Sequence, residues 1–62
     1  MSDRYSMTEC RANLAGLRSR ARVAGELARR REWSDVADLV REIESQASAI
    51  AATIERVYLG GD

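Results

Sequence analysis

The chain has 62 residues, and its ten arginines and ten acidic residues give a formal net charge of zero. A chain of this length buries only about 60% of the surface that it exposes when unfolded, so a single domain over residues 1–62 needs a further source of stability. One cysteine and no histidine exclude an internal disulfide and argue against a zinc site, which leaves oligomerisation as the expected source.

The composition predicts an all-α protein. Proline and phenylalanine are absent, and Ala, Arg, Glu and Leu, which are all good helix formers, dominate. No apolar run approaches the 18 residues of a membrane span, and the first residues lack the basic stretch and apolar core of a signal peptide. We therefore expect a cytoplasmic protein that does not enter the membrane.

A first helix is predicted over residues 7–31. Ser6 and Glu9 have the spacing of a capping box, and Tyr5 and Cys10 occupy the two positions of a hydrophobic staple. The apolar residues that follow keep the alternating spacing of three and four that is typical of helix packing. This stripe consists of Met7, Cys10, Leu14, Leu17, Ala21, Ala24 and Ala28, with Val23 and Leu27 beside it.

A second helix is predicted over residues 34–59, again with apolar residues three and four apart. Its stripe consists of Trp33, Val36, Val40, Ile43, Ala47, Ile50, Ile54 and Val57, with Leu39, Ala51 and Tyr58 beside it. Gly60 is a candidate for a left-handed cap at its end. Residues 1–5 and 60–62 are expected to be short flexible ends.

The two stripes are out of phase, which indicates two helices rather than one. Continuing the first stripe would place Arg31, Asp35 and Asp38 in the core. We therefore expect a break at Arg31–Ser34, with Ser34 as the N-cap of the second helix, and an antiparallel two-helix hairpin.

One hairpin covers only one side of each stripe, so the pattern predicts a partner. The partner is expected to be a second copy, forming a four-helix bundle, or another helical protein. In this packing Leu14, Leu17, Ala21 and Ala24 should face Val40, Ile43, Ala47 and Ile50. The expected partner interface consists of Leu14, Leu17, Ala21, Ala24, Ala28, Trp33, Val36, Val40, Ile43, Ala47, Ile50, Ile54 and Val57.

Charge is divided between the two halves of the chain. Residues 1–31 hold eight arginines and three acidic residues, a net charge of +5, whereas residues 32–62 hold two and seven, a net charge of −5. The two helices are therefore expected to attract each other along their flanks, although each exposed pair contributes only a few tenths of a kcal/mol.

No catalytic, cofactor-binding or metal-binding residue is predicted, and the chain is not expected to be an enzyme. Asp35, Asp38 and Glu42 share one helix face, which is interpreted as a solvated surface, with a divalent-ion site in a bundle as the alternative. Cys10 is interpreted as a small apolar side chain in the packing, with an intermolecular disulfide or a redox sensor as alternatives.

A row of arginines follows one edge of the first helix and consists of Arg4, Arg11, Arg18, Arg22 and Arg29. One interpretation is that the acidic second helix neutralises this row; the alternative is nucleic-acid contact through Arg11, Arg18, Arg22 and Arg29. A hairpin of this length that dimerises into a four-helix bundle resembles in architecture the Rop-type RNA-binding regulators of plasmid copy number. That resemblance implies RNA binding, but it assigns no contact residues.

A second resemblance is local. Trp33-Ser34-Asp35 lies at the predicted turn, and Tyr58 and Asp62 have the spacing Tyr-x-x-x-Asp after the second helix. These features are similar to the turn and export signal of the ESX-type secreted hairpins, although Ser34-Asp35 replaces the x-Gly of that family's turn. The sequence thus predicts a small interaction module, such as an adaptor, chaperone-like subunit or regulator, with a Rop-like regulator and an ESX-type secreted hairpin as alternatives.

Overall fold

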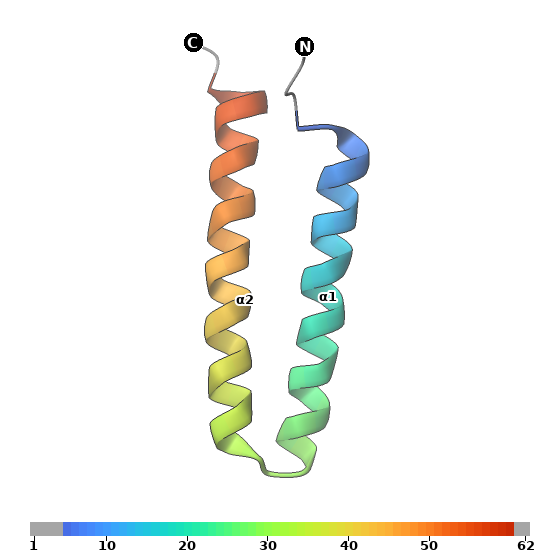
Figure 1. Ribbon diagram of the computed structural model, residues 1–62, viewed down its shortest axis with the longest axis vertical. Helices are drawn as coiled ribbons and strands as arrows, with labels where there is room; N and C mark the ends of the chain where they lie inside the picture. The colour runs from blue at the N-terminus through green and yellow to red at the C-terminus, as the bar shows by residue number, and fades with distance from the viewer. Residues whose placement is uncertain (1–4, 61–62) are drawn as a thin grey trace.

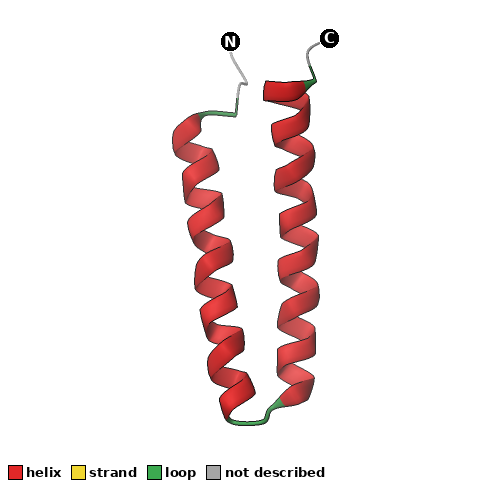
Figure 2. Ribbon diagram, turned by 180° about the vertical axis from the view of Figure 1, so that it is seen from behind, coloured by secondary structure: helices red, strands yellow, loops and turns green. Residues whose placement is uncertain are grey.

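The computed structural model describes residues 5–60 and consists of two helices that pack against each other as an antiparallel hairpin (Figure 1). Helix α1 spans Met7–Arg29 and helix α2 spans Trp33–Ile54, which continues into a π-helical turn, η1, at Glu55–Leu59. A short connection joins the helices at one end (Figure 2). The all-helical hairpin predicted from the sequence is confirmed. Most of the ends expected to be flexible fall outside the described residues.

The start of α1 has the predicted capping box. The Ser6 hydroxyl accepts a hydrogen bond from the Glu9 backbone N–H at 3.0 Å, and the Glu9 carboxylate accepts one from the Ser6 N–H at 3.2 Å. Two backbone donors that have no partner inside the helix are thereby satisfied.

The end of α1 is a Schellman motif built around an arginine. Arg31 lies in the left-handed region with φ of 62°, its N–H donates to the Ala28 carbonyl at 2.9 Å, and the Glu32 N–H donates to the Leu27 carbonyl at 3.0 Å. Glycine usually occupies this left-handed position because a Cβ there is strained. The chain therefore reverses without glycine or proline, at a cost of about 1–2 kcal/mol at Arg31.

Helix α2 begins earlier than the sequence suggested. Its N-cap is Glu32, which makes no side-chain capping hydrogen bond, so the prediction of Ser34 as N-cap is wrong. The Schellman motif explains the difference, because it ends at Glu32, whose carbonyl already accepts the Val36 N–H at 3.0 Å. Asp35 lies in the first turn of α2, as expected for the positive end of a helix dipole.

The end of the hairpin differs from prediction at Gly60. This residue has φ of −68° and ψ of −40°, so it is not a left-handed cap. It is nevertheless a position of close approach, because a Cβ at Gly60 would lie 2.8 Å from the carbonyl oxygen of Glu55. The close approach of Gly60 to the backbone of η1 therefore favours a residue without a Cβ at this position.

The two helices pack along a narrow seam, and none of the described residues is buried. Most of the half-buried residues recur three and four residues apart on each helix, which defines the heptad positions a and d. Gly16, Ala28, Ala47 and Ile54 are also half-buried and lie beside these positions. On α1 the half-buried seam residues are Cys10, Leu17, Arg20, Ala24 and Leu27, with the exposed Asn13 completing the repeat. On α2 they are Val36, Leu39, Ile43, Gln46, Ile50 and Thr53, and Val57 continues the repeat in η1.

The open end of the hairpin is closed by two hydrogen bonds that involve Tyr5. The Tyr58 hydroxyl donates to the Tyr5 carbonyl at 2.6 Å and so joins the two ends of the hairpin. The Asn13 side-chain amide donates to the Tyr5 hydroxyl at 2.6 Å, which ties the same residue to α1. Neither helix of the described part combines the length and apolar character that crossing a membrane requires.

The strain at Arg31 predicts that Arg31→Gly stabilises the protein by about 0.5–1 kcal/mol, because glycine adopts a left-handed conformation without a Cβ clash. The measurement is urea unfolding followed by circular dichroism at one fixed protein concentration. Arg31→Ala is the matched control, since it removes the same charge and keeps the Cβ. Equal stabilisation by alanine would assign the effect to charge instead of backbone strain.

The hydrogen bond at the open end predicts that Tyr58→Phe loosens η1. Loss of one hydrogen bond should raise amide hydrogen exchange at residues 55–59 about two- to fivefold. Tyr5→Phe is the comparison, because the carbonyl that accepts from Tyr58 is retained in that variant. Unchanged exchange in Tyr58→Phe would show that this contact does not hold the end together.

Candidate functional site

An apolar face runs along one side of the hairpin, next to the seam. On both helices it consists of the residues at heptad position e, which directly follow the d positions of the seam. We define the apolar face as Met7, Leu14, Ala21 and Ala28 on α1 and Trp33, Val40, Ala47 and Ile54 on α2. All eight residues are apolar.

The antiparallel arrangement places these two rows on the same side of the molecule. In antiparallel helices, positions e of one helix adjoin positions e of the other, and positions g adjoin positions g. The hairpin is one helix layer deep, with extents of 46 × 19 × 16 Å, so each broad side is formed by both helices. The apolar face is therefore continuous across α1 and α2.

The opposite broad side is different in character. Its g positions are Glu9, Gly16 and Val23 on α1 with Arg30 at the cap, and Asp35, Glu42 and Ala49 on α2 with Arg56 in η1. Five of these eight residues are charged. The hairpin as a whole is thus amphipathic, with one apolar side and one charged side.

Four of the large side chains of the apolar face are exposed, whereas Ile54, Ala28 and Ala47 are half-buried. The exposed fraction is 66% for Met7, 45% for Leu14, 61% for Trp33 and 39% for Val40. Contiguous exposed apolar residues on a soluble protein mark an interaction surface, whereas single exposed residues need no such explanation. The cluster is therefore the candidate functional site.

The structure divides the predicted interface residues between the seam and the apolar face. Leu14, Ala21 and Val40 are exposed in the single hairpin, so their expected packing against a partner stays a prediction. The division follows from geometry, since a helix with one neighbour turns only its a and d positions toward that neighbour. The half-buried seam takes Leu17, Ala24, Val36, Ile43, Ile50 and Val57, and the apolar face takes Leu14, Ala21, Ala28, Trp33, Val40, Ala47 and Ile54.

Four polar side chains lie at seam positions that the apolar pattern did not reveal. They are Asn13, Arg20, Gln46 and Thr53. A Cβ at Gly16 would lie 3.6 Å from the Arg20 guanidinium, so this side chain lies along its own helix. The Thr53 hydroxyl donates to the Ala49 carbonyl at 2.9 Å. The regular spacing of the seam from Cys10 to Leu27 was the available signal, but polar residues obscured it.

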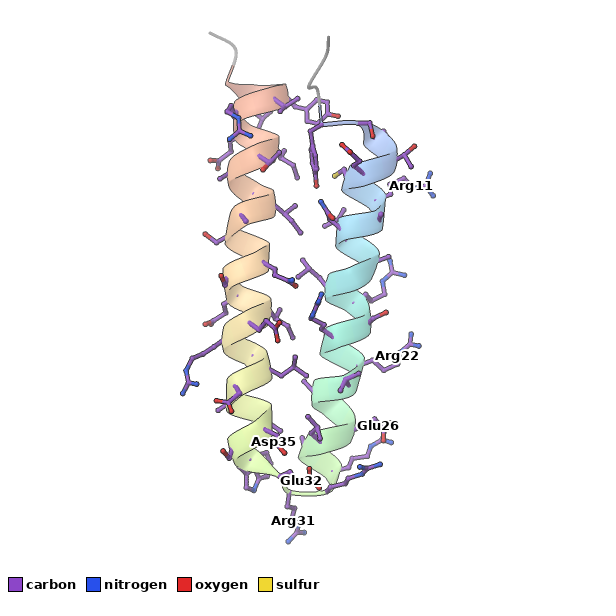
Figure 3. The ribbon with its side chains drawn as sticks, viewed as in Figure 1. Arg11, Arg22, Glu26, Arg31, Glu32 and Asp35 are labelled. Atoms are coloured by element: carbon purple, nitrogen blue, oxygen red, sulfur yellow. The ribbon has the colours of Figure 1, made fainter. Side chains whose placement is uncertain are left out.

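The arginine row lies on the outside of α1. Arg11 and Arg22 project away from α2 (Figure 3), and Arg18 and Arg29 are also exposed; Arg4 lies outside the described residues. Within residues 5–60 the ion pairs are Arg29–Glu26 at 3.4 Å and Arg41–Asp38 at 3.0 Å, and both lie within one helix. The expected pairing of opposite charges between the helices is therefore not found in this part of the chain.

The sequence also drew attention to Cys10, to possible metal ligands and to the ESX-like pair Tyr58 and Asp62. Cys10 is a free, half-buried cysteine at a seam position. No cluster of potential metal ligands and no pocket is found over residues 5–60. Tyr58 binds the Tyr5 carbonyl at the open end, while Asp62, the other half of the ESX-like spacing, is outside the described residues.

Comparison with known proteins assigns neither a family nor a function to the apolar face. Comparison with protein-family models, with curated proteins and with solved structures finds no match.

Proposed function

We propose that this protein is a non-enzymatic interaction module that associates with a second copy of itself through the apolar face. The observation that carries the proposal is an entirely apolar side on a hairpin in which no described residue is buried. Two hairpins stacked on these sides form a four-helix bundle whose core combines both seams and both apolar faces.

The size of the broad side agrees with this role. Its extents of 46 × 19 Å correspond to about 870 Å² in projection. A protein–protein interface of standard size buries about 800 Å² on each partner. Covering this side would also supply the apolar burial that a domain below about 70–80 residues lacks on its own.

A second copy is preferred to a different helical protein because the face holds both small and large residues. Ala21 and Ala28 leave room on α1, whereas Trp33 and Val40 project from α2. A surface that contains both shapes is able to complement itself under two-fold symmetry. Binding to another helical protein would appear in the test below as a monomeric wild type.

The proposal predicts that Val40→Asp dissociates the dimer. An unpaired carboxylate in the bundle core costs about 3 kcal/mol or more, which corresponds to a rise in the dissociation constant of at least about 100-fold. The measurement is sedimentation equilibrium over a range of micromolar concentrations. Helix content at low concentration should fall together with association, because the monomer has little core.

Val23→Asp is the matched control for this experiment. Val23 has a similar exposed fraction, 50%, but lies on the charged side of the hairpin. The same substitution there should leave the dissociation constant within about threefold of the wild-type value, since surface substitutions change stability by only about 0.5 kcal/mol. A wild type that is monomeric and cooperatively folded would overturn the proposal, as would equal effects of the two variants.

A second candidate function is RNA or DNA binding through the arginine row of α1. The observation in its favour is that Arg11, Arg18, Arg22 and Arg29 are exposed and form no ion pair with α2. Four phosphate contacts would give a plot of log affinity against log salt with a slope of about −3. The row lacks aromatic residues for stacking on bases, which places this function second.

This candidate predicts salt-sensitive binding of a structured RNA, measured by fluorescence anisotropy at low ionic strength. Arg22→Glu combined with Arg29→Glu should lower the affinity at least tenfold, because two phosphate contacts become repulsive. Arg56→Glu, in η1, should change the affinity much less. Absence of binding by the wild-type protein at low salt would exclude this function.

A further inference from the structure

Two arrangements satisfy two-fold symmetry when the apolar faces of two copies stack. In the first, the symmetry axis runs along the helices, so α1 lies over α2 of the partner copy and both turns lie at the same end. In the second, the axis runs across the helices, so α1 lies over α1 of the partner copy and the turns lie at opposite ends. The charged residues at the edge of the apolar face distinguish these arrangements.

Each helix has one charged residue beside the middle of the apolar face. Residues four apart adjoin each other on a helix surface. Arg18 therefore adjoins Leu14 on α1, and Glu44 adjoins Val40 on α2, and both are exposed. Nearer the turn, the corresponding edge positions are the uncharged Gly25 and Ala37.

Arg18 and Glu44 lie at nearly the same height in the hairpin. At the turn, α1 ends at Arg29 and α2 begins at Trp33, and these numbers add to 62. Antiparallel helices keep this sum along their length, because both rise by the same amount per residue. Arg18 is therefore level with Glu44 to within about one residue.

The two arrangements give opposite charge contacts across the interface. With the turns at the same end, Arg18 of each copy meets Glu44 of the other, and symmetry forms this pair twice. With the turns at opposite ends, Arg18 meets Arg18 and Glu44 meets Glu44, because each lies near the middle of its helix. Like charges in contact across an interface discriminate strongly against an arrangement.

Side-chain size does not distinguish the two arrangements. With the turns at the same end, the opposed residues are Leu14 and Ala47, Ala21 and Val40, and Ala28 and Trp33, with the large pair Met7 and Ile54 at the open end. With the turns at opposite ends, Met7 opposes Ala28, Leu14 opposes Ala21 and Val40 opposes Ala47, and the large pair is Trp33 and Ile54. Both arrangements therefore interdigitate large and small residues to the same extent, and charge selects between them.

The charges at the turn do not oppose this arrangement. Residues 26–35 hold three arginines and three acidic residues, so this segment has no net charge. Glu26, Arg31, Glu32 and Asp35 all lie at the turn end of the hairpin (Figure 3). Two turns are therefore able to lie side by side without strong repulsion.

The geometry points to a dimer in which both turns lie at the same end and α1 of each copy packs on α2 of the other, with Arg18 paired to Glu44 of the partner copy. This inference rests on the proposed self-association. The charged edge of α1 in each copy contacts the oppositely charged edge of α2 in the other copy. The partner is therefore selected by these charges as well as by the apolar area.

The orientation is tested by the distance between spin labels at the turn of the full chain. Cys10→Ser removes the native thiol, and Arg31→Cys provides the attachment point while retaining a Cβ at the strained position. Stacked hairpins are about 10 Å apart, so the labels should lie within about 25 Å of each other. Turns at opposite ends would separate them by at least about 35 Å, the length of a 23-residue helix, and would overturn the inference while leaving self-association intact.

A charge exchange tests the specific pair. Arg18→Glu and Glu44→Arg should each weaken dimerisation about tenfold at low salt, because two attractive pairs become repulsive, and the double variant should restore wild-type affinity. Arg22→Glu, which makes the same charge change on the outer side of α1, should have little effect. Single variants with unchanged affinity, or a double variant without recovery, would overturn the inference. A wild-type monomer would instead overturn the proposed function on which it rests.

Discussion

The packing of α1 against α2 along one seam is the constraint on which the rest of this structure depends. Each helix has a single neighbour, so only its a and d positions are partly covered, and no described residue is buried. Side chains such as Leu17 and Ile43 are half-buried in this way, while Leu14 and Val40, on the adjoining face of each helix, remain exposed. The exposed apolar side is a direct consequence of this two-helix geometry.

The turn converts this local packing into a defined surface. Backbone hydrogen bonds to the carbonyls of Leu27 and Ala28 close the end of α1, and α2 begins directly afterwards at Trp33. These bonds offset the unfavourable conformation of Arg31. A different turn length would rotate α2 relative to α1 and separate the two apolar rows, because each added residue turns the helix by about 100°. The short turn thus determines that both rows share one side.

The charged side chains contribute little to the packing of α1 against α2. The ion pairs of the described residues, Arg29–Glu26 and Arg41–Asp38, lie within single helices and are well exposed, so they contribute little to holding the hairpin together. The opposite charges of the two halves of the chain are therefore available for contacts between molecules. Arg18 and Glu44 border the apolar face, and a pair at the edge of an apolar interface contributes more to orientation than to affinity.

The sequence by itself determined the helices, the capping box at Ser6 and the break between two apolar stripes, because these depend on interactions within a few residues along the chain. It did not determine which apolar residues lie between the helices. An apolar stripe that includes Leu14 has the same spacing as the observed seam, so spacing alone does not choose between them. The seam also includes the half-buried Arg20, whose long side chain is able to keep its charged end in water. Nor did it predict the left-handed arginine at the turn, since the usual marker of that conformation is glycine. Only the tertiary structure decided these points, because the phase of each helix is set by contact with the other helix and not by its own pattern.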